Sequence, residues 1–71
     1  MARETSFRRW RKQVGFTQDE AADALGISKS QVANFDAGKD RASGRPATPP
    51  LAVRSLMTAI AMGQVPQPWP E

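Results

Sequence analysis

The sequence contains no cysteine and no histidine, and it has no long run of apolar residues. The lack of thiol and imidazole groups excludes disulfides, thiol and histidine catalysis and the usual zinc sites. No apolar run approaches the roughly eighteen residues that span a membrane. The start of the chain, MARETSFRRW, lacks the apolar segment of a signal peptide. We therefore expect a cytoplasmic protein without a membrane, metal or cofactor partner.

Acidic residues are also few, and none is placed for catalysis. The chain has seven of them, and Asp19, Glu20 and Asp23 lie where the first turns of a helix are expected, so that they complement its dipole. No pair of acids is accompanied by a base, a metal ligand or a phosphate-binding loop. The sequence therefore predicts a protein that is not an enzyme and has no small-molecule ligand.

What the chain does have is a modest apolar content and an excess of positive charge. Its 71 residues allow one domain at most, and 39% of them are hydrophobic and fall at helical intervals. Ten Lys and Arg against seven Asp and Glu give a net charge of +3, which favours a polyanionic partner. A core of this size is small, and such chains often gain stability from a partner chain.

Two capping boxes predict a pair of short helices within residues 17–38. In each box a Ser or Thr is followed three residues later by Glu or Gln, a pattern that satisfies the free N–H groups at the start of a helix. Each predicted helix is followed by a glycine, which adopts a left-handed conformation at low cost. The residues concerned are Thr17 and Glu20, Gly26, Ser28 and Gln31, and Gly38.

The spacing within this stretch is that of a helix-turn-helix. Counted from Gln18, the small Ala22 lies four residues on and Gly26 eight residues on. The apolar Val32 and Phe35 lie fourteen and seventeen residues on. The small residue allows close approach of the second helix, the glycine forms the corner, and the two apolar residues fix the second helix to the core.

Another helix is predicted before this motif. Phe7, Trp10 and Val14 share one face of a helix over about residues 6–14, because they are spaced at i, i+3 and i+7. Phe16 is expected in the core at the turn that follows. Further core residues are predicted in the motif and in the last helix: Leu25, Ile27, Val32, Phe35, Leu56 and Ile60.

The segment KDRASGRPATPP after Gly38 predicts a loop of about ten residues. Thr48 is then the expected N-cap of a last helix that has Pro49 at its first position and runs to Gly63. The prediction is an all-α, compact four-helix domain over residues 6–63, with an N-terminal arm at 1–5 and a Pro- and Trp-containing tail at 64–71.

The motif resembles the helix-turn-helix of small phage-repressor and Cro-like transcriptional regulators, the xenobiotic-response-element family. The resemblance covers about residues 5–62, and it implies a lambda-repressor-like fold, double-stranded DNA as the partner and a bacterial host cell. The matching residues are Thr17-Gln18, Ala22, Gly26-Ile27-Ser28, Val32 and Phe35-Asp36 with Gly38-Lys39. Asp36 occupies a position that in the family usually holds an acid facing a cation.

Four polar residues of the second motif helix are predicted to contact bases. A helix fits the major groove and presents its N-terminal residues to base edges. Lys29 can donate to guanine, Ser30 can donate or accept, and Asn34 can pair with adenine N6 and N7. Gln31 can also pair with adenine, although its capping-box bond competes. Lys29, Ser30 and Asn34 also match the base-contacting positions of the family.

Backbone contacts are predicted around this helix. Gln18 lies at a helix N-terminus suited to a phosphate oxygen, and the family places a phosphate contact there. Arg45 is expected to reach a phosphate or a narrow minor groove. The alternative for the loop is a solvated connector whose cations do not all touch DNA. The full set of predicted backbone contacts is Gln18, Ser28, Lys39, Arg41, Arg45, Arg9 and Lys12.

The last predicted helix is apolar on more than one side, which one neighbouring helix cannot cover. We therefore expect a homodimer through this helix and the tail, with the proline-stiffened tail placing Trp69 on the partner. The expected interface residues are Leu51, Val53, Met57, Ile60, Met62 and Trp69. An alternative is that Trp69 contacts its own subunit.

The leading hypothesis is a dimeric repressor, and specifically an autorepressor of a phage or mobile element, that binds an inverted repeat and is associated with the nucleoid when bound. The alternative hypothesis is a protein-interaction module, such as an antitoxin-like protein, in which the helix-turn-helix is only a scaffold. Exposed hydrogen-bonding residues on the second motif helix favour DNA.

Overall fold

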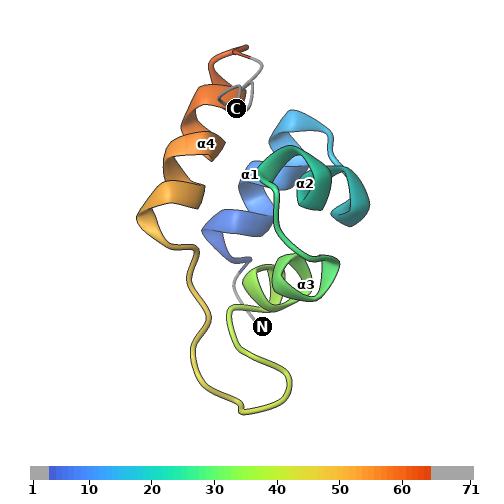
Figure 1. Ribbon diagram of the computed structural model, residues 1–71, viewed down its shortest axis with the longest axis vertical. Helices are drawn as coiled ribbons and strands as arrows, with labels where there is room; N and C mark the ends of the chain where they lie inside the picture. The colour runs from blue at the N-terminus through green and yellow to red at the C-terminus, as the bar shows by residue number, and fades with distance from the viewer. Residues whose placement is uncertain (1–3, 65–71) are drawn as a thin grey trace, which may run out of the picture.

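The computed structural model describes residues 4–64, which fold into four α-helices without a named strand (Figure 1). The all-α prediction is therefore confirmed. The helices are α1 (Ser6–Val14), α2 (Gln18–Leu25), α3 (Lys29–Ala37) and α4 (Leu51–Ala61). The N-terminal residues 1–3 and the tail residues 65–71, including Trp69, lie outside the described range. Within that range no helix is long and apolar enough to cross a membrane.

The helix-turn-helix forms where the capping boxes predict it. In each box the hydroxyl accepts the N–H of the third helical residue, and that residue's side chain accepts the N–H of the cap: Thr17 with Glu20 before α2, and Ser28 with Gln31 before α3. Gly26 closes α2 in the left-handed conformation, with φ of 68°. This corner turns the chain into α3 at once, so that the two helices pack together.

The start of α4 differs from the prediction. The helix begins at Leu51 with Pro50 as its N-cap, and no side chain caps it. Thr48 is therefore not the cap, and Pro49 is not in the helix. The reason is that a residue preceding proline is driven out of the helical region. Pro49 precedes Pro50, so the helix cannot start before Pro50, whose carbonyl accepts the first helical bond from Arg54 at 3.0 Å.

Aromatic rings fill the centre of the molecule. The ring of Phe7 lies 5.5 Å from that of Phe35 and 5.6 Å from that of Trp10, measured between centroids. Phe16 meets Trp10 edge-on at 6.0 Å. The Trp10 indole N–H also donates to the carbonyl of Met57 at 2.8 Å, which fixes α4 to α1. The remaining buried core residues are Ala21, Ala22, Leu25, Val32, Val53 and Met57. The predicted core residues Val14, Phe16, Ile27, Leu56 and Ile60 are partly buried and pack against the core.

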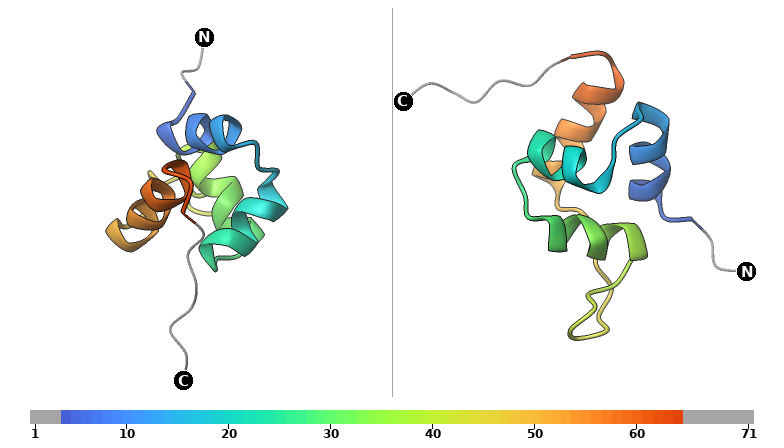
Figure 2. Two further views of the ribbon diagram at one scale, coloured as in Figure 1. Left: turned by 90° about the horizontal axis from the view of Figure 1, so that it is seen from above. Right: turned by 90° about the vertical axis from the view of Figure 1, so that its right-hand side faces the viewer.

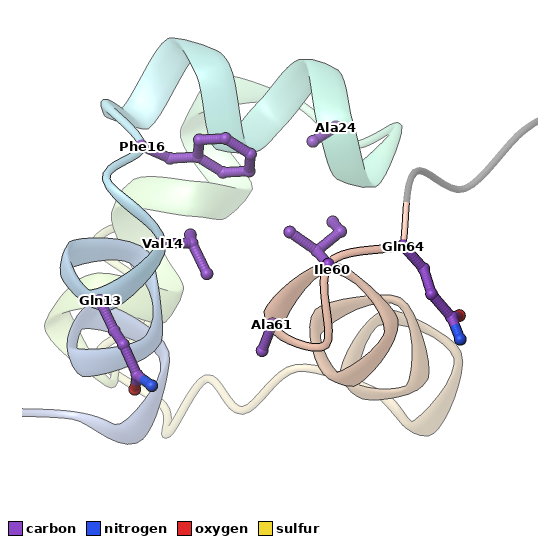
Figure 3. Close-up of a pocket in the computed structure, with 8 residues that line it drawn as sticks. Gln13, Val14, Phe16, Ala24, Ile60, Ala61 and Gln64 are labelled. Carbon is purple, nitrogen blue, oxygen red and sulfur yellow. The ribbon is translucent and has the colours of Figure 1, made fainter.

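Helices α1 and α2 each pack against both α3 and α4 (Figure 2). This packing determines which side chains of α4 are buried. Val53 and Met57 are only 7% and 9% exposed, so they belong to the core of this chain and cannot reach a partner. Ile60 is partly buried and points toward Val14 in an apolar groove of about 500 Å³ (Figure 3). The large apolar side chains that remain exposed among the described residues are Leu51 and Met62.

Candidate nucleic-acid interface

The first turn of α3 presents three polar side chains to solvent. Lys29, Ser30 and Gln31 are all exposed. Their position is set by the Ser28 cap before them and by Val32 after them, whose side chain is fully buried. The polar side of α3 is therefore exposed to solvent from its first residue onward. This N-terminal end is the part of the second helix that enters the major groove in helix-turn-helix proteins.

A polar cleft of about 450 Å³ lies beside this turn. It brings together residues from the start of α2, from α3 and from the loop after α3, which are distant in sequence. Its lining contains five of the predicted DNA contacts: Gln18, Lys29, Ser30, Asn34 and Arg41. Ala33, Asp40 and Ala42 complete it. The cleft therefore joins predicted base contacts to predicted backbone contacts on one surface.

The buried Asp36 organises the side of this surface that faces α1. Its carboxylate accepts bonds from Arg11 Nε at 3.2 and 3.0 Å and pairs with an Arg11 terminal nitrogen at 2.8 Å. Arg11 also donates to the carbonyl of Phe16 at 2.9 Å. The acid that the family resemblance places opposite a cation is thus paired with Arg11, and the pair ties α3 to α1.

Gln18 belongs to the same network, which the sequence did not indicate. Its Nε2 donates to Asp36 at 2.9 Å. An amide nitrogen carries two hydrogens, so the second hydrogen of Gln18 stays available for a phosphate while the first holds the side chain in place. The structure therefore pre-orients the residue for which a phosphate contact was predicted.

Two other predicted contacts are partly engaged within the chain. Gln31 Oε1 accepts bonds from the Ser28 N–H at 3.0 Å and from the Ser28 hydroxyl at 3.3 Å. The Ser28 hydroxyl in turn accepts the Gln31 N–H at 3.1 Å. The groups left to meet DNA are the Gln31 amide hydrogens and the exposed backbone at the start of α3.

The chain after α3 forms a hairpin loop, which we define as residues 39–46, and this loop projects beyond α3 (Figures 1 and 2). Lys39 and Pro46 form an isolated antiparallel bridge. Asp40 builds the turn: its N–H donates to the Arg45 carbonyl at 2.7 Å, and its carbonyl accepts the Gly44 N–H at 2.7 Å. Its carboxylate accepts the N–H groups of Ala42 at 2.8 Å and of Ser43 at 3.2 Å. The loop is therefore internally hydrogen-bonded and presents exposed Arg41 and Arg45.

The basic residues of α1 fall into two groups by their position relative to these cavities. Arg8 and Arg11, with Gln18 and Arg41, line a shallow cavity next to the polar cleft. Arg9 and Lys12, which the sequence favoured, line neither cavity. Arg8 was not selected from the sequence, although its spacing of three residues from the half-buried Arg11 places the two on one side of a helix.

Two of the predicted cations form ion pairs within the chain. Lys12 lies 2.7 Å from Glu4, and this hydrogen bond lowers the pKa of the Glu4 carboxyl below its ordinary value. Lys29, the first residue of α3, lies 3.2 Å from Asp19 in the first turn of α2. The Lys29–Asp19 pair is well exposed, so breaking it to bind DNA costs little.

Comparison with known proteins adds a family assignment to this geometry. A protein-family model described as Helix-turn-helix matches residues 7–45, which include nearly all of α1, the whole of α2 and α3, and most of the hairpin loop. No curated protein and no solved structure gives a match to the chain.

Proposed function

Because the chain belongs to the helix-turn-helix family of phage-repressor and Cro-like DNA-binding transcriptional regulators, we propose that it is a dimeric, sequence-specific repressor of an inverted-repeat operator. The observation that carries the proposal is the set of exposed polar residues at the start of α3 beside the polar cleft. Repression follows when the bound dimer covers a promoter. The regulated promoter is its own, as in the autorepressors of phages and mobile elements.

Base recognition is assigned to the first turns of α3. Lys29 donates to guanine O6 and N7, Ser30 donates to or accepts from a neighbouring base edge, and Gln31 uses its amide hydrogens. Asn34, one turn after Ser30, lines the same cleft. Side chains of this kind at the N-terminal end of a recognition helix are suited to direct readout in the major groove.

Backbone binding is assigned to the two flanks of α3. On one flank Gln18 and the amides at the start of α2 meet one strand, with Arg8 beside them. On the other flank the hairpin loop carries Lys39, Arg41 and Arg45, all exposed. Phosphate contacts of this type set the register of the protein on the duplex and make binding dependent on salt. Arg9 and Lys12 of α1 lie outside the two cavities and are assigned weaker, peripheral contacts.

The dimer is assigned to the outer face of α4, together with Trp69 from the tail. Leu51 and Met62 are 70% and 71% exposed, and the exposed Ser55 and Thr58 lie between them at helical spacing. An antiparallel pair of these helices places Leu51 against Met62 of the second copy and Ser55 against Thr58. The face is therefore self-complementary, as a twofold interface requires. Ile60 lines the apolar groove between α4 and α1, so it lies at the edge of this face of α4.

Binding to the DNA upstream of the protein's own gene tests the proposal. Mobility shifts at two salt concentrations compare this DNA with a shuffled duplex of the same composition. We expect tighter binding to the upstream DNA, and we expect Ser30→Ala to weaken only that specific binding by about tenfold, because Ser30 carries no charge. Gln13→Ala, an exposed change on α1, is the matched control and is expected to bind as the wild type does.

Equal affinity of the wild type for both duplexes would contradict sequence-specific recognition. The absence of any DNA binding, with formation of a stable complex with another protein encoded nearby, would instead favour the interaction-module hypothesis.

A further inference from the structure

Asn34 forms a connection between α3 and the hairpin loop. Its side-chain Oδ1 accepts the backbone N–H of Arg41 at 3.2 Å. Its backbone carbonyl accepts the N–H groups of Gly38 at 2.8 Å and Lys39 at 3.1 Å. Asn34 is half-buried and lines the polar cleft with Arg41. One residue of α3 therefore determines where the loop leaves the helix and where the Arg41 backbone lies.

The bond to Arg41 also fixes the orientation of the Asn34 amide. A backbone N–H can only donate, so a rotated amide would place two donors against each other. The amide oxygen is thus turned toward the loop, and the two Nδ2 hydrogens form no hydrogen bond among the described residues. Orientation of an asparagine amide is assigned from such partners, and here the partner is a main-chain donor.

We infer that Asn34 acts on DNA as a donor, with its oxygen reserved for the hairpin loop, so that it selects guanine rather than adenine; this inference rests on the proposed DNA binding. Guanine presents two acceptors, N7 and O6, on its major-groove edge. Adenine presents one acceptor and one donor, and bidentate pairing with it needs the Asn34 oxygen beside Nδ2 on the base edge, whereas this oxygen is turned toward the Arg41 N–H of the hairpin loop. Asn34 is therefore a specificity-determining residue through Nδ2 and a positioning residue through Oδ1.

The positioning role concerns Arg41. Asn34 accepts hydrogen bonds from two N–H groups at the start of the hairpin loop, those of Lys39 and Arg41. The turn built by Asp40 is internally hydrogen-bonded, so the position of the loop's start determines the position of the rest of the loop. The side chain of Arg41 is exposed and shares both cavities with Gln18. Loss of the Asn34 side chain should therefore weaken a phosphate contact that Asn34 itself does not make.

Two substitutions at Arg41 distinguish the role of its backbone N–H from the role of its guanidinium. Arg41→Ala removes the guanidinium and keeps the N–H, whereas Arg41→Pro removes both. Each variant is titrated against operator duplexes that carry each of the four bases at each half-site position, over a range of salt concentrations. Asn34→Ala completes the set and the wild type is the reference.

In the wild type we expect guanine to be preferred at one position by about tenfold. Arg41→Ala should keep that preference and should reduce the slope of log K against log salt by about one unit, since one phosphate contact is lost. Arg41→Pro should lose most of the preference as well, because the amide is free to rotate. Asn34→Ala should lose the preference and also show a reduced salt slope.

Equal base preference in Arg41→Pro and Arg41→Ala would overturn the inference, as would a position at which adenine is preferred only when Asn34 is present. An unchanged salt slope in Asn34→Ala would remove the positioning role. A wild-type protein that does not distinguish operator from shuffled DNA would contradict the proposed function itself.

Hydrogen exchange tests the same link without DNA and without proline. In the free wild-type protein the Arg41 amide is expected to exchange several-fold more slowly than in Asn34→Ala. The Arg9 amide, which donates to Thr5 at 3.0 Å in a different part of the fold, is the internal control and should exchange equally in both. Equal exchange at Arg41 in the two proteins would overturn the link.

Discussion

At the scale of single residues, Asp36 connects the stability of the fold to the DNA-binding surface. It is the buried polar or charged residue of the described part of the chain, and its carboxylate is shared by Arg11 of α1 and Gln18 of α2. Three helices therefore depend on one carboxylate. The same bonds hold Gln18 in the orientation proposed for phosphate binding.

Removal of this carboxylate should strongly destabilise the protein. Asp36→Ala leaves the Arg11 guanidinium, whose side chain is 14% exposed, without its partner, and we expect a loss of about 3 kcal/mol in the free energy of unfolding. Arg11→Met combined with Asp36→Leu should recover part of this loss, because neither charge is then left unpaired. Urea unfolding of Arg11→Met, of Asp36→Leu and of the double variant that combines them measures the coupling.

A double variant whose loss equals the sum of the two single losses would show that the pair is not coupled. Asp19→Ala is the control for removal of an acid: it breaks only the exposed pair with Lys29, and stability should change by less than about 1 kcal/mol.

The partner of Asp36 could have been predicted more closely than it was. Four cations lie on α1, but only Arg11 is four residues after the core residue Phe7, which places it on the same side of the helix. The internal bonds of Gln18 and Asn34 could not have been predicted, because they depend on how α2 and the hairpin loop are placed against α3. Periodicity identifies the side of a helix that faces the core, and it does not specify the partners of a polar side chain.

At the scale of elements, helix starts were predictable where a side chain caps the helix. The starts of α2 and α3 follow from Thr17 and Ser28, whose hydroxyls accept the expected N–H groups. The start of α4 was misplaced because Thr48 has the residue type of a cap, while the restriction imposed by Pro50 on Pro49 decides the outcome. The turn in the hairpin loop had a signal in Asp40 followed by Ser43 and Gly44, a composition typical of turns.

This difference between the two helix starts predicts opposite effects of two similar substitutions. Ser28→Ala removes the hydroxyl that accepts the Gln31 N–H at 3.1 Å, so we expect a loss of about 1 kcal/mol in the free energy of unfolding. Thr48→Ala should be nearly neutral, because no side chain caps α4. Thermal or urea unfolding of both variants provides the measurement. A loss at Thr48 as large as that at Ser28 would mean that Thr48 caps α4 after all.

At the scale of the whole molecule, the DNA-binding unit and the proposed dimer face are carried by different helices. The match to the family ends within the hairpin loop, and α4 follows it. Helix α4 supplies Val53 and Met57 to the core, which accounts for two of the residues that the sequence assigned to a dimer. Leu51 and Met62 still have exposed side chains. The sequence showed that α4 has more apolar surface than one neighbour covers, and the packing on α1 and α2 was needed to show which part is left.

The remaining surface predicts a dimer with a defined helix register. Leu51→Glu places a charge on the outer face of α4 without touching the core, so the monomer should stay folded while sedimentation at micromolar concentration shows loss of the dimer. Antiparallel packing brings this position against Met62 of the second copy, so Met62→Lys added to Leu51→Glu should restore dimers through paired opposite charges. Thr48→Glu, exposed and outside α4, is the control. A Leu51→Glu protein that remains dimeric would exclude this face, and failure of the charge pair to rescue a disrupted dimer would exclude the antiparallel register.

Because two recognition helices must enter major grooves about 34 Å apart, loss of the dimer should also lower affinity for a duplex with both half-sites far more than for one with a single half-site.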